Sequence, residues 1–74
     1  MLVAEVTLKE LVEAEVRTRQ TTLFDLAYEG DISWSTFHTV MNSGITKGTR
    51  FETIEKFARI LGKRPSELIR IVAE

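Results

Sequence analysis

The window 32–51 of this 74-residue chain is rich in polar side chains and contains no acidic residue. Its hydroxyl, imidazole, amide and indole groups can form neutral hydrogen bonds, and its charged side chains are those of Lys47 and Arg50. Residues 1–31, by contrast, hold seven acids and three bases, and residues 52–74 hold four acids and five bases. The net charge of −1 argues against nucleic acid as a partner, since proteins that bind it usually carry a basic surplus. The uneven distribution of charge along the chain weakens that argument, because a nucleic acid bound to residues 32–51 would not be repelled by any acidic side chain there.

The composition excludes several other kinds of chemistry. There is no Cys, which removes disulfides, thiolate metal sites and thiol nucleophiles, and a single His does not suffice for a zinc site built by this chain. The sequence also lacks a glycine-rich phosphate loop and a recognisable pair of catalytic carboxylates. We therefore expect no enzymatic activity, no cofactor and no metal.

The length bounds the organisation of the chain. Seventy-four residues, 43% of them apolar, suit one small globular domain over residues 1–74, without a second sensory or catalytic domain. No apolar run approaches the ~18 residues of a membrane helix, and the first residues lack the basic start of a signal peptide. We therefore expect a cytoplasmic protein without a membrane partner.

Helix-capping signals predict where the first three helices begin. Thr7 and Glu10 have the spacing of a capping box, in which a hydroxyl and a carboxylate each accept from the other residue's amide. Thr22 and Ser33 are N-caps of the same kind for two shorter helices. These caps predict a first helix that begins at residue 8 and a second helix that follows Thr22 and ends at Glu29. A third helix is predicted over 33–43.

Two further helices are expected after a glycine-containing loop. Thr49 and Glu52 again have capping-box spacing, and Gly62 stands where a C-terminal cap belongs. Pro65, acceptable in a first turn, opens the last helix. The buried face of the fourth helix is expected to consist of Phe51, Ile54, Phe57, Ala58 and Leu61. Residues 1–6 form a lead-in that could be frayed, an extra helical turn or a short strand.

Residues 23–42 have the pattern of two short helices joined by a tight turn. Ala27 provides a small side chain where the helices cross, Asp31 tolerates left-handed backbone, and Phe37 helps to hold the second helix on the first. These features are typical of a helix-turn-helix.

At this point the chain resembles the lambda-repressor-like family of DNA-binding domains, also called Cro-type or Xre-type. The Phe-Ala-Arg-Ile-Leu-Gly run at 57–62 and the Pro-Ser-Glu-Leu run at 65–68 resemble the last two helices of that family. The resemblance implies a compact, all-α, five-helix fold. Two positions depart from the family pattern: Leu23 replaces a Gln that touches a phosphate, and Asp31 replaces the turn Gly.

The resemblance implies that the third helix is the recognition helix and lies in the major groove of DNA. With Phe37, Val40 and Met41 facing inward, none of its outward side chains is acidic. Hydroxyl and amide groups can hydrogen-bond base edges, and an indole offers a plane for a thymine methyl group or a sugar. The predicted base-contacting residues are Ser33, Trp34, Ser35, His38, Thr39 and Asn42. Without Arg or Gln among them, we expect modest specificity that relies partly on DNA shape.

The resemblance also suggests where phosphates are contacted. Lys47 and Arg50 flank a glycine loop after the recognition helix, where the family makes such contacts. Thr22 caps a helix whose free amides could receive a phosphate, and Arg19 ends the first helix. The alternatives are a solvated loop, a plain cap and a cation that favours the helix dipole.

The last helix carries more apolar side chains than one face of two turns can bury within the chain. Ile69 and Val72 are therefore predicted at a homodimer interface, although they could instead close the core of a monomer. A symmetric dimer would bind palindromic half-sites about one DNA turn, ~34 Å, apart.

The expected function is sequence-specific binding of double-stranded DNA by a small transcriptional regulator, a repressor of phage or plasmid type. The alternative is an antitoxin-like or adaptor module whose acidic first third, residues 1–31, binds a basic protein partner.

Overall fold

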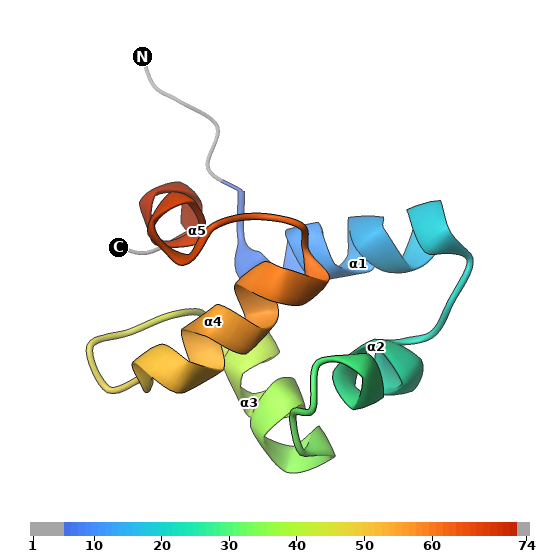
Figure 1. Ribbon diagram of the computed structural model, residues 1–74, viewed down its shortest axis with the longest axis horizontal. Helices are drawn as coiled ribbons and strands as arrows, with labels where there is room; N and C mark the ends of the chain where they lie inside the picture. The colour runs from blue at the N-terminus through green and yellow to red at the C-terminus, as the bar shows by residue number, and fades with distance from the viewer. Residues whose placement is uncertain (1–5, 73–74) are drawn as a thin grey trace.

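The computed structural model describes residues 6–72, with side chains to residue 70, and all regular elements in that range are α-helices. The helices are α1 (Leu8–Arg19), α2 (Leu23–Glu29), α3 (Trp34–Ser43), α4 (Phe51–Ile60) and α5 (Pro65–Val72) (Figure 1). The predicted all-α, five-helix architecture is confirmed. Residues 1–5 of the lead-in lie outside the described residues, and Val6 has no regular structure.

Three of the predicted helix starts are confirmed atom by atom. The hydroxyl of Thr7 accepts from the amide of Glu10 at 3.1 Å, and the carboxylate of Glu10 accepts from the amide of Thr7 at 2.9 Å, which completes the capping box. The hydroxyls of Thr22 and Ser33 accept from the amides three residues ahead, at 3.1 and 3.3 Å. Each cap satisfies an amide that the helix leaves without an internal acceptor.

The predicted start of the fourth helix is wrong by one residue. Arg50 is the N-cap of α4, and no side chain accepts a hydrogen bond at this cap. The hydroxyl of Thr49 is used in the preceding loop, where it accepts from the amide of Thr46 at 3.0 Å. A hydroxyl held by the loop does not close a capping box with Glu52.

The predicted buried face of α4 is also partly wrong. Phe51 is 57% exposed, whereas the other predicted residues are buried as expected: Ile54, Phe57, Ala58 and Leu61. Phe51 lies in the first turn of α4, where the helix extends beyond the packed core. Ile60, which the prediction omitted, is buried near the other end of the helix.

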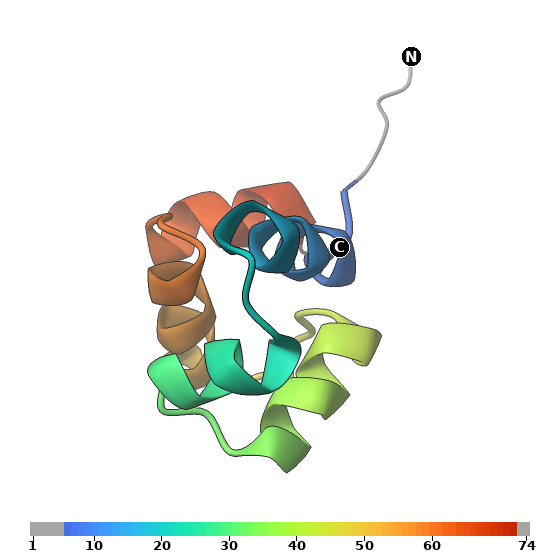
Figure 2. The ribbon, with the colours of Figure 1, turned by 90° about the vertical axis from the view of Figure 1, so that its right-hand side faces the viewer.

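The core lies between α1 and α5 on one side of the molecule and α2 and α3 on the other, and α4 joins the two sides (Figure 2). Helix α1 packs against α2 and α3, α2 packs against α3, and α4 packs against α5. Every helix contributes to the largest fully buried side chains, which are Phe37, Phe57, Leu8, Leu26, Leu68 and Val12. Phe37 and Phe57 stack with ring centroids 5.2 Å apart and join α3 to α4. None of the described helices has the length and apolar character that a membrane span requires.

Gly30 allows α2 and α4 to approach closely. It has an ordinary φ of −82°, so its backbone conformation does not require glycine. A Cβ atom at this position would lie 2.9 Å from Cγ2 of Ile60 and 3.3 Å from Cδ1 of Ile32. The absent side chain therefore leaves room for two buried isoleucines.

We expect Gly30→Ala to destabilise the domain by about 1 to 3 kcal/mol, because the added methyl group overpacks the junction between α2 and α4. Gly48→Ala is the matched control, since its Cβ would meet only the hydroxyl oxygen of Thr46 within 4 Å, at 3.8 Å. The free energy of unfolding, measured by urea denaturation, distinguishes them. Equal stability of the two variants would show that the junction is not close-packed.

Candidate nucleic-acid interface

The turn between α2 and α3 is held from both sides. The amide of Ile32 donates to the carbonyl of Ala27 at 3.0 Å, and Ile32 itself is buried. Asp31 adopts the predicted left-handed conformation, with φ of 58°. From α4, the ammonium group of Lys56 donates to the carbonyl of Asp31 at 2.9 Å and lies 3.9 Å from its carboxylate. These contacts fix the direction in which α3 leaves the turn.

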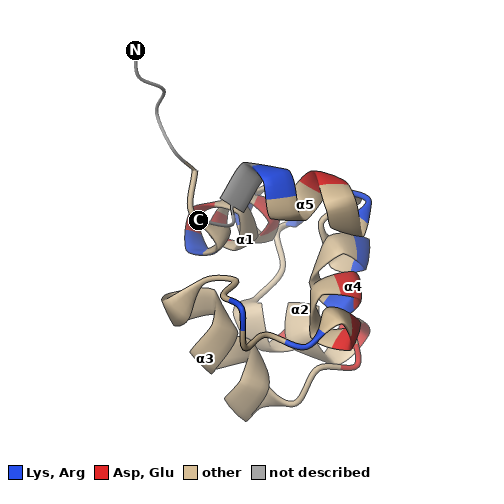
Figure 3. Cartoon of the chain, turned by 90° about the vertical axis from the view of Figure 1, so that its left-hand side faces the viewer, with Lys and Arg blue, Asp and Glu red and all other residues tan. Residues whose placement is uncertain are grey.

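Helix α3 presents one buried face and one exposed polar face. Phe37 and Met41 are buried and Val40 packs partly buried against the core, as predicted. The six predicted site residues lie together on the exposed face: Ser33, Trp34, Ser35, His38, Thr39 and Asn42. Figure 3 shows that α3 carries no charged residue. The exposed face of α3 therefore holds no Lys, Arg, Asp or Glu.

Hydrogen bonds within α3 occupy some of these side chains. The hydroxyl of Ser33 donates to that of Thr36 at 3.0 Å, and the amide nitrogen of Asn42 donates to the carbonyl of His38 at 2.9 Å. This bond uses one of the two N–H donors of Asn42, and the other N–H and the amide oxygen can still pair with a base in a bidentate manner. Thr36, which is exposed, was missed by the sequence reasoning, although its spacing from Ser33 places it on the same end of the helix.

Trp34 belongs to a group of aromatic rings that crosses from α2 to α3. Its ring centroid lies 5.8 Å from that of buried Phe37, at an interplanar angle of 22°, and 5.8 Å from that of His38. On its other side, Phe24 of α2 lies 5.6 Å away. The sequence reasoning missed Phe24, because its exposure depends on how α2 crosses α3. Trp34 thus packs on the core through Phe37, and 41% of its surface remains exposed.

The loop between α3 and α4 presents the two cations of the acid-free window. Lys47 stands at the tip of a turn in which the amide of Thr49 donates to the carbonyl of Thr46 at 3.1 Å and the amide of Gly48 donates to the Thr46 hydroxyl at 3.2 Å. Arg50 follows as the N-cap of α4. Both cations are exposed, and Figure 3 shows the basic segments of this loop beside uncharged α3.

An open groove of about 1260 Å³ separates α3 from this loop and the first turns of α4. Hydroxyl groups dominate the part of its wall near α3 and the loop, where they come from Ser33, Thr36, Thr39, Ser43, Thr46 and Thr49. Arg50 and Lys56 add positive charge to the wall, and Asp31 and Glu52 add negative charge to it. Among the described residues, no three His, Asp or Glu side chains converge as metal ligands do. The groove therefore offers many hydrogen bonds to a ligand, and its two cations are balanced by two carboxylates, one of which lies 3.9 Å from Lys56.

A comparison of the sequence with models of known protein families identifies the family of this domain. The model of the Cro/C1-type HTH DNA-binding domain matches residues 12–74, which include all of α2, α3, α4 and α5. The chain belongs to this family. Comparisons with curated proteins and with solved structures gave no match.

In this Cro/C1-type domain, the departure at Leu23 has a structural explanation. Leu23 packs partly buried against the core, so it stabilises the start of α2 instead of presenting a polar group. Thr22, just before it, is exposed and uses its hydroxyl to accept from the amide of Asp25. A phosphate contact at Thr22 stays a prediction.

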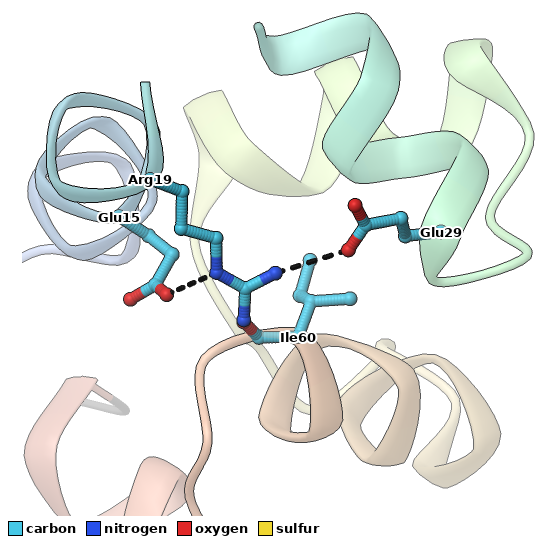
Figure 4. Close-up of polar contacts among 4 residues, drawn as sticks. All are labelled: Glu15, Arg19, Glu29 and Ile60. Atoms are coloured by element: carbon cyan, nitrogen blue, oxygen red, sulfur yellow. Dashed lines mark hydrogen bonds and ion pairs between the residues drawn. The ribbon is translucent and has the colours of Figure 1, made fainter. Parts of the chain in front are cut away.

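Arg19 is engaged within the domain. Its guanidinium forms ion pairs with Glu15 and, at 3.0 Å, with Glu29, and it donates to the carbonyl of Ile60 at 2.8 Å (Figure 4). These contacts join the end of α1 to α2 and to the C-terminus of α4, where a positive charge is favoured by the helix dipole. A phosphate contact at Arg19, which the sequence suggested and which stays a prediction, would compete with three existing partners.

Of the two predicted dimer residues, the structure describes the side chain of Ile69. Ile69 packs partly buried against the core of its own chain, so only part of its side chain is open to a partner. The side chain of Val72 lies outside the described residues.

We expect Arg19→Ala to lower the free energy of unfolding by about 1 kcal/mol, because it removes a charge-assisted link between three helices at a partly exposed position. Arg17→Ala is the matched control, since Arg17 is an exposed residue of the same last turn and loses the same helix-dipole interaction. Arg19→Lys should be intermediate, because Lys keeps the charge but lacks the fork-shaped donor group. Chemical denaturation measures all three, and equal destabilisation by Arg17→Ala and Arg19→Ala would contradict the role of Arg19.

Proposed function

We propose that this Cro/C1-type domain binds double-stranded DNA with α3 in the major groove and acts as a small transcriptional repressor of phage or plasmid type. The observation that carries the proposal is the exposed face of α3, which groups six neutral side chains able to contact bases and lies beside a loop with two exposed cations. An acidic side chain on that face would repel the phosphates that flank the groove. Helix α3 has none.

The side chains on this face suggest how sequence would be read. Ser33 and Ser35 lie at the start of α3, and Thr39 and Asn42 lie beyond its first turn. Hydroxyl and amide groups are therefore spread along the length of the helix. Such groups donate to or accept from base edges, but they discriminate less sharply than the bidentate pair of Arg with guanine. We infer modest specificity, with a contribution from DNA shape.

The phosphate backbone would follow the hydroxyl-lined groove beside α3. Lys47 and Arg50 can each neutralise a phosphate, and the hydroxyls of the groove can donate to phosphate oxygens. Thr22, the exposed N-cap of α2, and Arg19, at the end of α1, complete the proposed phosphate contacts. A phosphate at Arg19 would compete with the three partners that its guanidinium already holds.

A homodimer formed through α5 would suit this mode of binding, because two copies of α3 would then read a palindromic site. The partial exposure of Ile69 supports such an interface. Sedimentation of the protein alone and bound to DNA tests it, and a single protein copy per site would contradict it.

The second candidate function is a protein-interaction module that uses the acidic first third of the chain. That region holds seven acids, but Glu15 and Glu29 pair with Arg19, and Asp31 pairs with Lys56. These ion pairs offset part of the negative charge, although the side chain of Asp31 is still 94% exposed. We prefer the DNA-binding function because the exposed face of α3 has no acidic residue.

The first test is selection of random duplexes by the purified protein at about 100 mM salt, followed by titration of the selected site and of an unrelated duplex. Enrichment of a common motif with tighter binding to it would support the proposal. Weak, salt-sensitive binding to every duplex alike would contradict sequence-specific regulation and favour the protein-interaction function.

We expect Lys47→Ala and Arg50→Ala each to weaken binding to all duplexes and to reduce the slope of log K against log salt concentration by about one unit for each phosphate that is no longer neutralised. Arg64→Ala is the control, because exposed Arg64 lies in the connection between α4 and α5, away from α3 in Figure 1. Slopes that do not differ from that of Arg64→Ala would remove Lys47 and Arg50 from the interface.

We expect Thr39→Ala and Asn42→Ala to cost about 1 to 3 kcal/mol in binding to the selected site and to leave binding to unrelated DNA nearly unchanged, because contacts with base edges are made only on the right sequence. Both residues are exposed, so the unfolding midpoint should stay near that of the wild type. Equal weakening on both duplexes would show that these side chains do not read bases.

A further inference from the structure

Two exposed aromatic side chains stand together where the N-terminal ends of α2 and α3 meet. Phe24, in the first turn of α2, is 62% exposed, and Trp34, the first residue of α3, is 41% exposed. Their ring centroids lie 5.6 Å apart at an interplanar angle of 49°. We call Phe24 and Trp34 the aromatic pair. The chain leaves much of this apolar surface in water, although small domains usually bury such side chains.

The aromatic pair is supported on the inner side. Trp34 stacks at 22° on Phe37, which is fully buried, and Phe37 in turn stacks on Phe57 of α4. His38 lies against another side of the indole, with ring centroids 5.8 Å apart. A ring held by three neighbours loses little conformational entropy when a ligand covers its remaining surface.

The aromatic pair is continuous with the proposed DNA-binding face. Trp34 precedes Ser35 on α3, and the N-terminal residues of a recognition helix are those that approach base edges. Helix α3 also has no Arg, Lys or Gln that would pair with guanine or adenine. The apolar group that bases present in the major groove is the C5-methyl group of thymine.

We propose that Phe24 and Trp34 together recognise thymine C5-methyl groups, so that the preferred DNA site has thymine at the positions that face the aromatic pair. This inference rests on the proposed function. Apolar contact adds a preference for thymine to the modest discrimination that the hydrogen-bonding groups of α3 supply. Phe24 thereby becomes a specificity residue on α2, outside the recognition helix.

The test compares the selected site with versions in which 2′-deoxyuridine replaces thymidine at one position at a time. Uracil keeps the hydrogen-bonding groups of thymine and lacks only the methyl group. Burial of one methyl group is worth ~0.8 kcal/mol, so the wild-type protein should bind about fourfold more weakly when a contacted thymine is replaced. Replacements outside the contacted positions should leave the Kd unchanged and serve as internal controls.

Substitutions in the aromatic pair test whether these two side chains contact the thymine methyl group. Phe24→Ala should reduce the ratio of Kd values for uracil and thymine at the contacted positions to below about twofold, since half of the apolar surface is removed. Tyr28→Ala is the matched control: Tyr28 lies one turn along α2, is 83% exposed, and should retain the fourfold ratio. Trp34→Ala should abolish the ratio, but Trp34 packs on the core, and Phe24→Ala therefore gives the result that does not depend on folding.

The outcomes separate the two proposals. Equal affinity for thymine and uracil at every position of a tightly bound site would overturn the role of the aromatic pair and leave the DNA-binding function intact. Failure to bind any duplex tightly would overturn both, and would make the aromatic pair a surface for a protein partner. A fourfold ratio that persists in Phe24→Ala would also contradict the inference.

Discussion

The stack of Phe37 on Phe57 is the contact on which the proposed interface depends. It joins α3 to α4 through two fully buried rings, and the same residue, Phe37, supports Trp34 on the opposite side. The exposed face of α3 thus has a rigid base that reaches the centre of the domain. In a chain of 74 residues the core is thin, so one aromatic contact of this kind contributes both to stability and to the position of the surface groups.

Polar contacts complete this arrangement at the edges of the core. Arg19 links α1 to α2 and α4, and Lys56 links α4 to the turn that precedes α3. Both cations are thereby committed to the fold, whereas Lys47 and Arg50 remain exposed beside α3. A net charge of −1 is compatible with DNA binding because position, and not only number, decides which charges meet phosphates.

The sequence was sufficient at most places where a few neighbouring residues decide the structure. The caps at Thr7, Thr22 and Ser33 were predicted because each depends on an amide three residues away, and helical spacing was enough to separate the two faces of α3. Prediction failed where distant contacts decide, as in the exposure of Phe24, which depends on the crossing of α2 and α3. It also failed at Thr49, where two local partners compete and the hydroxyl accepts from the amide of Thr46 in the loop instead of capping α4. The partners of Arg19 come from helices far along the chain, at sequence separations of 10 and 41 residues.

Trp34 also gives this domain an intrinsic optical probe. It is the single Trp of the chain, it touches the core through Phe37, and part of its ring faces solvent. Its fluorescence therefore arises from one site, without overlapping emission from other indoles. Loss of the core would expose the buried part of this ring to water, whereas a ligand on α3 would cover the exposed part. The two events should shift the emission maximum in opposite directions, so that unfolding and binding can be followed separately in unlabelled protein.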